Sequence, residues 1–371
     1  MLLHGLTDSP YSLRHIAEIY RLHGFVAIGV RLPGHGSVPA ALTEVEWEDW
    51  MAATPLATRE ARRRAGPGKP LHIVSYSNGG ALALKYALDN LADAKSSRPD
   101  RLVLISPMIG ITRFARFAGL AALPAYFPAF AKAAWLDILP EFNPFKFNSF
   151  PVNAAPQAHR LTQAVQAEIG NRRGALAELP PILTFQSAVD FMVSTSSSVV
   201  SDLYQRLPAD GSELVVFDIN RATQLGMLLR PSAADALTDL LPAAPRHFRA
   251  TIIANDDKNG EMSERVVEAG TQAETARPLG VAYPSDVYSL SHVALPFLTS
   301  DALYGSNPDV FEDFGIRLGN VTPRGERNVL VASIDSLVRL TFNPFFHYPA
   351  QRIEEGLPAT RDQVETSAPP P

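Results

Sequence analysis

Residues 71–86, LHIVSYSNGGALALKY, constrain the fold more than any other stretch of this chain. The first five are mostly apolar and have the length of a buried strand, and the last six are good or tolerable helix formers. A strand, a sharp turn and a helix therefore follow one another, with Ser77 in the turn. A serine in such a turn projects its hydroxyl from a sheet, beside the backbone N–H groups of a helix N-terminus, where an oxyanion would form. We predict that Ser77 is a nucleophile and that the backbone N–H of Asn78 is one oxyanion donor.

The turn departs from the usual Gly-x-Ser-x-Gly pattern at one position. Ser75 takes the place of the first glycine, which gives the sequence Ser-Tyr-Ser-Asn-Gly. A small residue still fits there, so the departure weakens the motif without breaking it. The alternative interpretation is an ordinary strand-to-helix turn rich in small residues, because a motif match is a hypothesis.

Apolar runs alternate with helical segments on both sides of this turn. Such alternation favours a parallel sheet covered by helices on both faces. Residues 1–108 and 180–357 would form the two parts of this core, and the proline-rich tail 358–371 would be disordered. We expect further strands at residues 25–30, 102–106, 181–186, 214–217 and 248–254, and helices over 11–23, 47–64 and 329–342.

Residues 109–179 interrupt the alternation. Phenylalanine, alanine and proline are frequent in this segment, which predicts short helices with many turns. Because the segment lies between two predicted strands of the sheet, we expect a cap insertion over the site, with an inner face that binds an apolar group. The alternative is a small subdomain that only buries its own aromatic side chains.

Composition and charge exclude several classes of protein. The absence of cysteine excludes disulfides, thiol catalysis and cysteine-ligated metals. The net charge is −5 without a basic block, which gives no support for a nucleic-acid partner. No apolar run has the length of a transmembrane helix, although membrane association is not defined by the sequence. Sequence motifs for zinc, phosphate-loop and dinucleotide sites are lacking, so we expect neither a metal nor a cofactor.

The first residues suggest that the fold begins earlier than this sequence. Residues 1–5 have the pattern of the end of a buried strand, and no charged region or signal-type apolar core precedes them. We expect the first strands of the fold to precede Met1. Any targeting segment would be lost together with these strands, so cytoplasmic localisation is only the default expectation.

A serine nucleophile needs a base within hydrogen-bond reach and an acid that orients the base. Asp190 follows the strand predicted at 181–186, at the carboxyl end where parallel sheets place functional groups. His292 lies late in the chain, in the small and apolar setting Ser-Leu-Ser-His-Val-Ala-Leu-Pro. We predict Asp190 as the acid and His292 as the base, although an aspartate at a strand end is often only a surface or capping residue. The competing residues are Asp218, Asp256 and Asp257 for the acid, and His347 for the base.

The loop after the opening strand is the candidate for the second oxyanion donor. It has the sequence His4-Gly5-Leu6-Thr7, and we predict that the N–H of Leu6 is the donor. His4 and Gly5 would shape the loop rather than react. The alternative interpretation of histidine and glycine at a strand end is a plain turn.

Four stretches together resemble the α/β-hydrolase superfamily. Residues 3–12, LHGLTDSPYS, resemble the oxyanion loop of bacterial carboxylesterases. Residues 31–36, RLPGHG, resemble the Pro-Gly-His-Gly loop of the monoacylglycerol lipase and serine-aminopeptidase-like branch. Residues 75–80 resemble the nucleophile elbow, and residues 185–190, FQSAVD, resemble the acid loop. The resemblance implies an α/β-hydrolase fold, a triad of Ser77, Asp190 and His292, and a cap after the strand that ends at Ser106.

These features predict a serine hydrolase that cleaves carboxylic esters through an acyl-enzyme intermediate. The expected substrate is a small-molecule ester with an apolar acyl group. The alternatives are a peptidase that releases N-terminal residues, which would need an acidic patch near the site, and a non-catalytic binding protein of the same fold. The separation between positions 190 and 292 exceeds the few tens of residues typical of the family, so we also expect a large insertion there.

Overall fold

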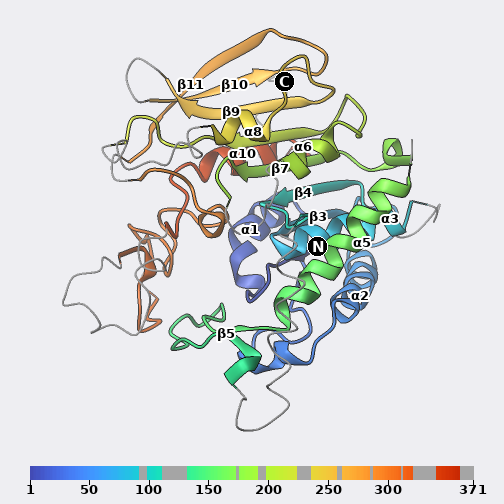
Figure 1. Ribbon diagram of the computed structural model, residues 1–371, viewed down its shortest axis with the longest axis vertical. Coiled ribbons are helices and arrows are strands. Elements are labelled where there is room, and N and C mark those ends of the chain that lie inside the picture. Colours follow the sequence, from blue (N-terminus) through green and yellow to red (C-terminus); the bar gives the residue numbers. More distant parts are fainter. Residues whose placement is uncertain are drawn as a thin grey trace, which may run out of the picture.

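A nine-stranded sheet runs through the computed structural model of the protein, in the order β11-β10-β9-β8-β7-β4-β3-β1-β2 (Figure 1). The structure describes residues 1–91, 98–110, 132–172, 175–190, 198–223, 235–256, 261–284, 287–310, 312–320 and 340–359. Neighbouring strands from β2 to β9 pair in parallel, and β10 and β11 are antiparallel. The strands are β1 (Leu2–Leu3), β2 (Gly29–Val30), β3 (His72–Tyr76), β4 (Arg101–Ile105), β7 (Ile182–Ser187), β8 (Glu213–Phe217), β9 (Arg249–Asn255), β10 (Glu261–Val267) and β11 (Glu274–Ala282).

Helices cover both faces of this sheet. Successive residues of a strand point to opposite faces, so each mostly apolar strand supplies side chains to the helices on both sides. In β3, Ile73 packs into the apolar cluster formed with α2, α3, α5, α6 and α8, whereas Val74 packs into the cluster formed with α1 and α10. The mostly parallel sheet with helices on both faces was predicted from the sequence. The helices are α1 (Arg14–Leu22), α2 (Trp47–Ala65), α3 (Asn78–Asp89), α5 (Ala154–Asn171), α6 (Ser198–Tyr204), α8 (Ala236–Leu240) and α10 (His347–Glu354). Among the described helices, none combines the length and the apolar character needed to cross a membrane.

The strand order reverses at β1, and this reversal positions the candidate site. β1 pairs with β2 on one side and with β3 on the other, so the chain leaves β1 toward one edge of the sheet and later returns beside it. Ligands of open α/β sheets bind at the carboxyl ends of the strands at such a switch point. The loop that follows β1 and the turn that follows β3 both lie there.

Several expected elements differ from the structure. The strand predicted at 25–30 is reduced to β2, because the N–H of Phe25 donates to the Tyr20 carbonyl at the end of α1 (3.0 Å) instead of to a neighbouring strand. The short helices predicted within 109–179 are wrong in part, since α5 has 18 residues and β5 (Trp135–Asp137) pairs with β6 (Phe150–Pro151). Residues 111–131 of the predicted cap, most of the helix predicted at 329–342 and the tail from residue 360 lie outside the described residues.

The expected insertion between Asp190 and His292 extends the sheet. The chain leaves the end of β8 at Asn220, forms β9, β10 and β11, and returns beside its point of departure. There the Asn220 N–H donates to the Tyr288 carbonyl (2.8 Å), and the Asn220 amide donates to the Val287 carbonyl (2.7 Å). The Ser187 hydroxyl at the end of β7 also donates to the Leu290 carbonyl (3.0 Å). These contacts return the chain to the carboxyl ends of the strands just before His292.

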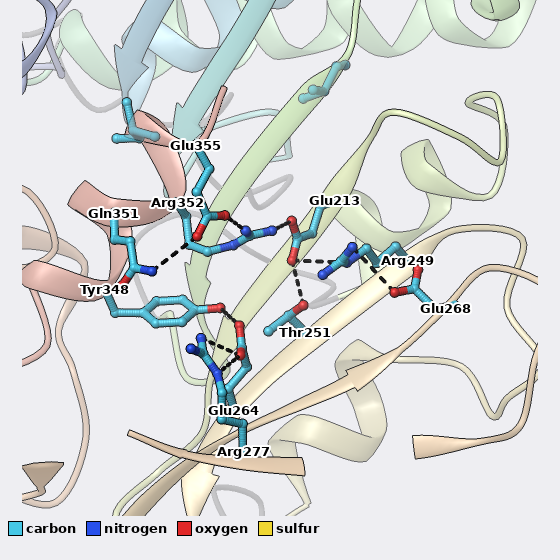
Figure 2. Close-up of polar contacts among 12 residues, drawn as sticks. Glu213, Arg249, Thr251, Glu264, Glu268, Arg277, Tyr348, Gln351, Arg352 and Glu355 are labelled. Carbon is cyan, nitrogen blue, oxygen red and sulfur yellow. Dashed lines mark hydrogen bonds and ion pairs between the residues drawn. The ribbon is translucent and has the colours of Figure 1, made fainter. Parts of the chain in front are cut away.

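Polar contacts join α10 to the added strands (Figure 2). The Tyr348 hydroxyl donates to Glu264 of β10 (2.6 Å), and Arg277 of β11 forms an ion pair with the same carboxylate (2.8 Å). Burial alone would raise the pKa of Glu264, but the hydrogen bonds from Tyr348 and Arg277 outweigh it and hold that pKa below its ordinary value. Glu213 of β8 is bound in turn by Thr251 (2.6 Å) and by Arg352 of α10. The inserted strands are thus anchored to the rest of the fold.

Candidate functional site

Ser77 lies in a strained turn between β3 and α3. Its backbone angles are φ 54° and ψ −118°, which an L-residue adopts only when its surroundings impose them. Three hydrogen bonds do so here: the Ser77 N–H donates to Ile105 (3.0 Å), and the Ser77 carbonyl accepts from Gly80 (2.8 Å) and Met108 (2.9 Å). Strain at a turn between a strand and a helix is characteristic of a nucleophile elbow.

The glycines after Ser77 let the first turn of α3 approach the sheet. A Cβ atom on Gly79 would lie 2.7 Å from the Leu3 carbonyl carbon and 2.8 Å from the His4 oxygen. A Cβ atom on Gly80 would lie 2.6 Å from the side chain of Pro107. Real Cβ atoms are essentially never found within 3.0 Å of such neighbours, so both positions require glycine.

The loop after β1 lies directly against this turn. A Cβ atom on Gly5 would be 3.1 Å from the Ser77 Cβ, which places the loop beside the nucleophile candidate. The ring of His4 holds the loop in place, since its Nδ1–H donates to the Gly5 carbonyl (2.8 Å) and its Nε2 accepts from the Leu32 N–H (3.1 Å). The bond from the Leu32 N–H requires the neutral ring, because Nε2 can accept only when it carries no proton. Burial, followed by the neighbouring His35 ring, lowers the pKa of His4 to about 3.

The structure brings Asp190 and His292 together. His292 begins a short 3₁₀ helix (His292–Ala294), and its Nδ1 lies 2.9 Å from the Asp190 Oδ2. His292 and Asp190 are buried, with 5% and 7% of their surfaces exposed, and Ser77 is similarly buried with 6% exposed. Tyr76, which precedes Ser77, lies against the His292 ring with a centroid separation of 5.1 Å. The predicted acid and base therefore meet next to the serine turn.

The competing residues lie in other settings. The Asp218 carboxylate accepts from Arg221 (2.7 Å) and from the Ile219 N–H (2.8 Å), so it stabilises the turn after β8. Asp256 and His347 are exposed, the latter at the start of α10. Asp257 lies outside the described residues.

The two predicted oxyanion donors flank Ser77. Leu6 is half-buried in the loop after β1, and Asn78 is the first residue of α3 and fully buried. The side-chain amide of Asn78 has no hydrogen-bond partner among the described residues. Leu6 also contacts Met108 and Ala158, so an apolar wall lies beside the turn.

Two residues near the site were not singled out from the sequence. Tyr76 is one, and its bulk in the elbow motif was the only available signal. Asp8 is the other, and its carboxylate accepts from the Ser9 N–H (2.8 Å) and from the Ser12 hydroxyl. Burial raises the pKa of Asp8, although the positive charges of Lys146 and of protonated His292 act in the opposite direction. Asp8 is therefore a second buried carboxyl close enough to His292 to interact with its charge.

Part of the predicted cap touches the loop after β1. The Phe147 N–H donates to the Thr7 carbonyl (2.7 Å), and the Phe145 ring stacks on the Tyr11 ring at 3.5 Å. A segment far along the chain therefore contacts this loop and the 3₁₀ turn that follows it. Within the described part of the chain, no group of three or more histidine, cysteine, aspartate or glutamate residues could hold a metal ion. A hydroxyl, a hydrogen-bonded imidazole–carboxylate pair and backbone N–H groups lie close together at this turn, and acyl transfer uses a set of this kind.

Comparisons with known proteins give a family and several relatives. The sequence model of the alpha/beta hydrolase family matches residues 1–304. A thermostable monoacylglycerol lipase from Bacillus sp. (strain H-257) is 24% identical over 216 residues, which cover 58% of this chain and 78% of that lipase. A solved structure from work on LipS and LipT, two metagenome-derived lipolytic enzymes, has a TM-score of 0.46 at 20% identity and covers 64% of this chain and 91% of that chain. A soluble variant of monoglyceride lipase from Saccharomyces cerevisiae has a TM-score of 0.42 at 14% identity, covering 58% of this chain and 75% of that chain.

Proposed function

Because the chain belongs to the alpha/beta hydrolase family, we propose that it is a serine hydrolase that cleaves carboxylic esters. The lipase relatives support ester hydrolysis at the level of the family. They also support a lipid or another small-molecule ester as the substrate class. The residues of this chain give the proposal its detail.

One observation carries the proposal: the hydrogen bond between His292 and Asp190, which are 102 residues apart in the sequence. An insertion of three strands separates them, yet the chain returns to place the imidazole against the carboxylate beside Ser77. A buried carboxylate bound to Nδ1 fixes the tautomer that leaves Nε2 free to accept a proton. That orientation is what a serine hydroxyl needs from its base.

In the proposed reaction, Ser77 Oγ attacks the ester carbonyl carbon while His292 Nε2 takes the hydroxyl proton. The imidazolium is stabilised by Asp190 and returns the proton to the alcohol oxygen as the C–O bond of the ester breaks. The acyl group then remains on Ser77. A water molecule, activated in the same way by His292, releases the carboxylic acid and regenerates the serine.

The negative oxygen of the tetrahedral intermediate would be held by the backbone N–H groups of Leu6 and Asn78. Each such donor typically contributes about 3–4 kcal/mol of transition-state stabilisation. The close packing at Gly5 and Gly79 supports this assignment, because it keeps the loop after β1 and the first turn of α3 at a fixed separation. The positive end of the α3 dipole adds to the stabilisation.

An apolar acyl group fits the surroundings of Ser77. Leu6, Met108 and Ala158 form an apolar contact beside the turn, and Ala158 comes from the segment 109–179. We assign this segment as a cap over the hydrolase core formed by residues 1–108 and 180–357. The contact between Phe147 and Thr7 supports that assignment.

Hydrolysis of matched substrates tests the proposal. We expect the protein to hydrolyse p-nitrophenyl esters with short or long acyl chains and to leave aminoacyl p-nitroanilides intact. Cleavage of the anilides alone would instead indicate a peptidase. A peptidase of that kind would need an acidic patch near the site. Glu141, one acidic residue of the proposed cap, already accepts hydrogen bonds from the backbone N–H groups of Asn148 (2.9 Å) and Ser149 (2.8 Å). Absence of both activities in the folded protein would leave a binding protein and refute the proposed function.

A further inference from the structure

Tyr76 is a buried aromatic residue that touches three parts of the proposed catalytic machinery. It precedes Ser77 in the chain and is the last residue of β3. Its ring lies 5.1 Å from the His292 ring, centroid to centroid, with an angle of 38° between the planes. Its hydroxyl donates to the His292 backbone carbonyl (3.4 Å).

The same ring also supports the loop that carries Leu6. A Cβ atom on Gly5 would lie 3.2 Å from both Cδ1 and Cε1 of Tyr76, so the loop rests on the ring edge. Tyr76 is 3% exposed and packs with the cluster on the α1 and α10 side of the sheet. The ring therefore cannot move away from His292 without disturbing the end of β3 or the loop after β1.

We propose that Tyr76 is a positioning residue whose ring holds the His292 imidazole in line with Asp190 and stabilises the imidazolium formed during the reaction. The inference rests on the proposed hydrolase function. It goes beyond the triad, because it assigns part of the positioning of the His292 ring to a residue other than Ser77 and Asp190.

The geometry supports an orienting and an electrostatic role. An aromatic ring within about 6 Å of a cation attracts it through the negative face of the ring. The groups that face His292 are then Asp190, which accepts from Nδ1, the Tyr76 ring, and the Asp8 carboxyl, whose charge interacts with that of His292. Asp190 supplies the main stabilisation of the charged ring. Tyr76 adds a smaller contribution and blocks rotation of the imidazole on one side.

Two substitutions of Tyr76 distinguish the contribution of its ring from that of its hydroxyl. Tyr76→Phe keeps the ring and removes a long hydrogen bond, whereas Tyr76→Leu keeps an apolar side chain and removes the aromatic face. The rate of labelling of Ser77 by a fluorophosphonate, measured between pH 5 and 9, reports the fraction of His292 that is neutral. We expect Tyr76→Phe to label within about threefold of the wild-type rate with the same pH midpoint.

Tyr76→Leu is expected to behave differently. Loss of the aromatic face disfavours the imidazolium, so the pH midpoint should move down by about half a unit. Loss of orientation should lower kcat for p-nitrophenyl butyrate by about tenfold, with KM nearly unchanged. If the leucine variant does not fold, Tyr76→Met, with a longer and more flexible side chain, provides the same measurement.

Tyr86→Leu is the matched control. Tyr86 is a buried tyrosine of α3 that packs in the opposite apolar cluster, so the same substitution there costs packing without removing a ring from His292. We expect a lower unfolding temperature and an unchanged pH midpoint. The inference is overturned if Tyr76→Leu also keeps the wild-type midpoint, or if Tyr76→Phe shifts it as far as Tyr76→Leu does. A wild-type protein that is not labelled at all would instead refute the proposed function.

Discussion

Gly79→Ala tests how the fold builds the candidate site. The substitution adds one methyl group where the first turn of α3 touches the end of β1. That methyl group would lie 2.7 Å from the Leu3 carbonyl carbon, whereas ordinary contact begins at 3.4 Å. The Leu3 carbonyl oxygen would be closer still, so the backbones must separate by more than about 0.7 Å, the difference between these two distances.

This displacement has two consequences. Overpacking of this kind costs about 1–3 kcal/mol of unfolding free energy. The separation also moves the N–H of Asn78 away from the loop that carries Leu6, and misplacement by about 1 Å can reduce a reaction rate by about 100-fold. We expect Gly79→Ala to lose both stability and reactivity.

Urea unfolding and the rate of fluorophosphonate labelling measure the two effects. Gly170→Ala is the control, because Gly170 lies inside α5 and a Cβ atom there meets nothing within 4 Å. Alanine should stabilise that helix by about 0.5–1 kcal/mol and leave labelling unchanged. Unfolding of Gly79→Ala at the wild-type urea concentration, together with labelling at the wild-type rate, would contradict this role of Gly79.

Three further predictions concern the acid, the stability at low pH and the oxyanion donor. Asp190→Asn should lower kcat for p-nitrophenyl butyrate by about 10⁴-fold, since the asparagine favours the wrong tautomer of the imidazole. The control Asp218→Asn should change kcat by less than about threefold. Equal losses in the two variants would mean that the acid is misassigned. His4 and His35 have pKa values lowered to about 3 and about 4 by burial, so the unfolded chain binds more protons below pH 6.5. Urea unfolding should therefore show a stability that is fully present above pH 6.5 and lost on acidification toward pH 3, and His35→Gln should reduce this slope; the same slope in both proteins would contradict the prediction. Asn78→Leu should raise the unfolding free energy by about 1 kcal/mol, because it replaces a buried amide that lacks a partner among the described residues. The variant should still be labelled by the fluorophosphonate, because the backbone N–H remains. Loss of labelling in a folded variant would assign the Asn78 side chain an essential role.

The local features of this fold were predictable from the sequence because their signals are local. The strand, turn and helix around Ser77 follow from an apolar run, small residues and helix formers in direct succession. β10 and β11 were missed because their apolar signals are weak. The buried residues of β10 include the polar Ser263 and Glu264. All but one residue of β11 is exposed, so it lacks the apolar alternation that identifies a half-buried strand. The helix α10 begins with His-Tyr-Pro, which gives no strong helix signal.

The candidate site required contacts that no sequence pattern encodes. Asp190 could be proposed from its position after a strand, and His292 from its late position in a small and apolar setting. Their pairing, however, depends on the chain returning to Asn220 after an insertion. The contact of Tyr76 with His292 arises only when β3 and the segment after the insertion meet in space. Long-range closure of this kind determines the site geometry, and a single sequence carries little information on it.

The central claim is that Ser77 is the nucleophile, and covalent labelling tests it most directly. The wild-type protein is treated with a fluorophosphonate and digested, and the peptides are analysed by mass spectrometry. We expect one adduct, on Ser77, and no adduct in Ser77→Ala, whose circular dichroism spectrum should match that of the wild type. An unlabelled wild-type protein, or an adduct that persists in Ser77→Ala, would contradict the claim.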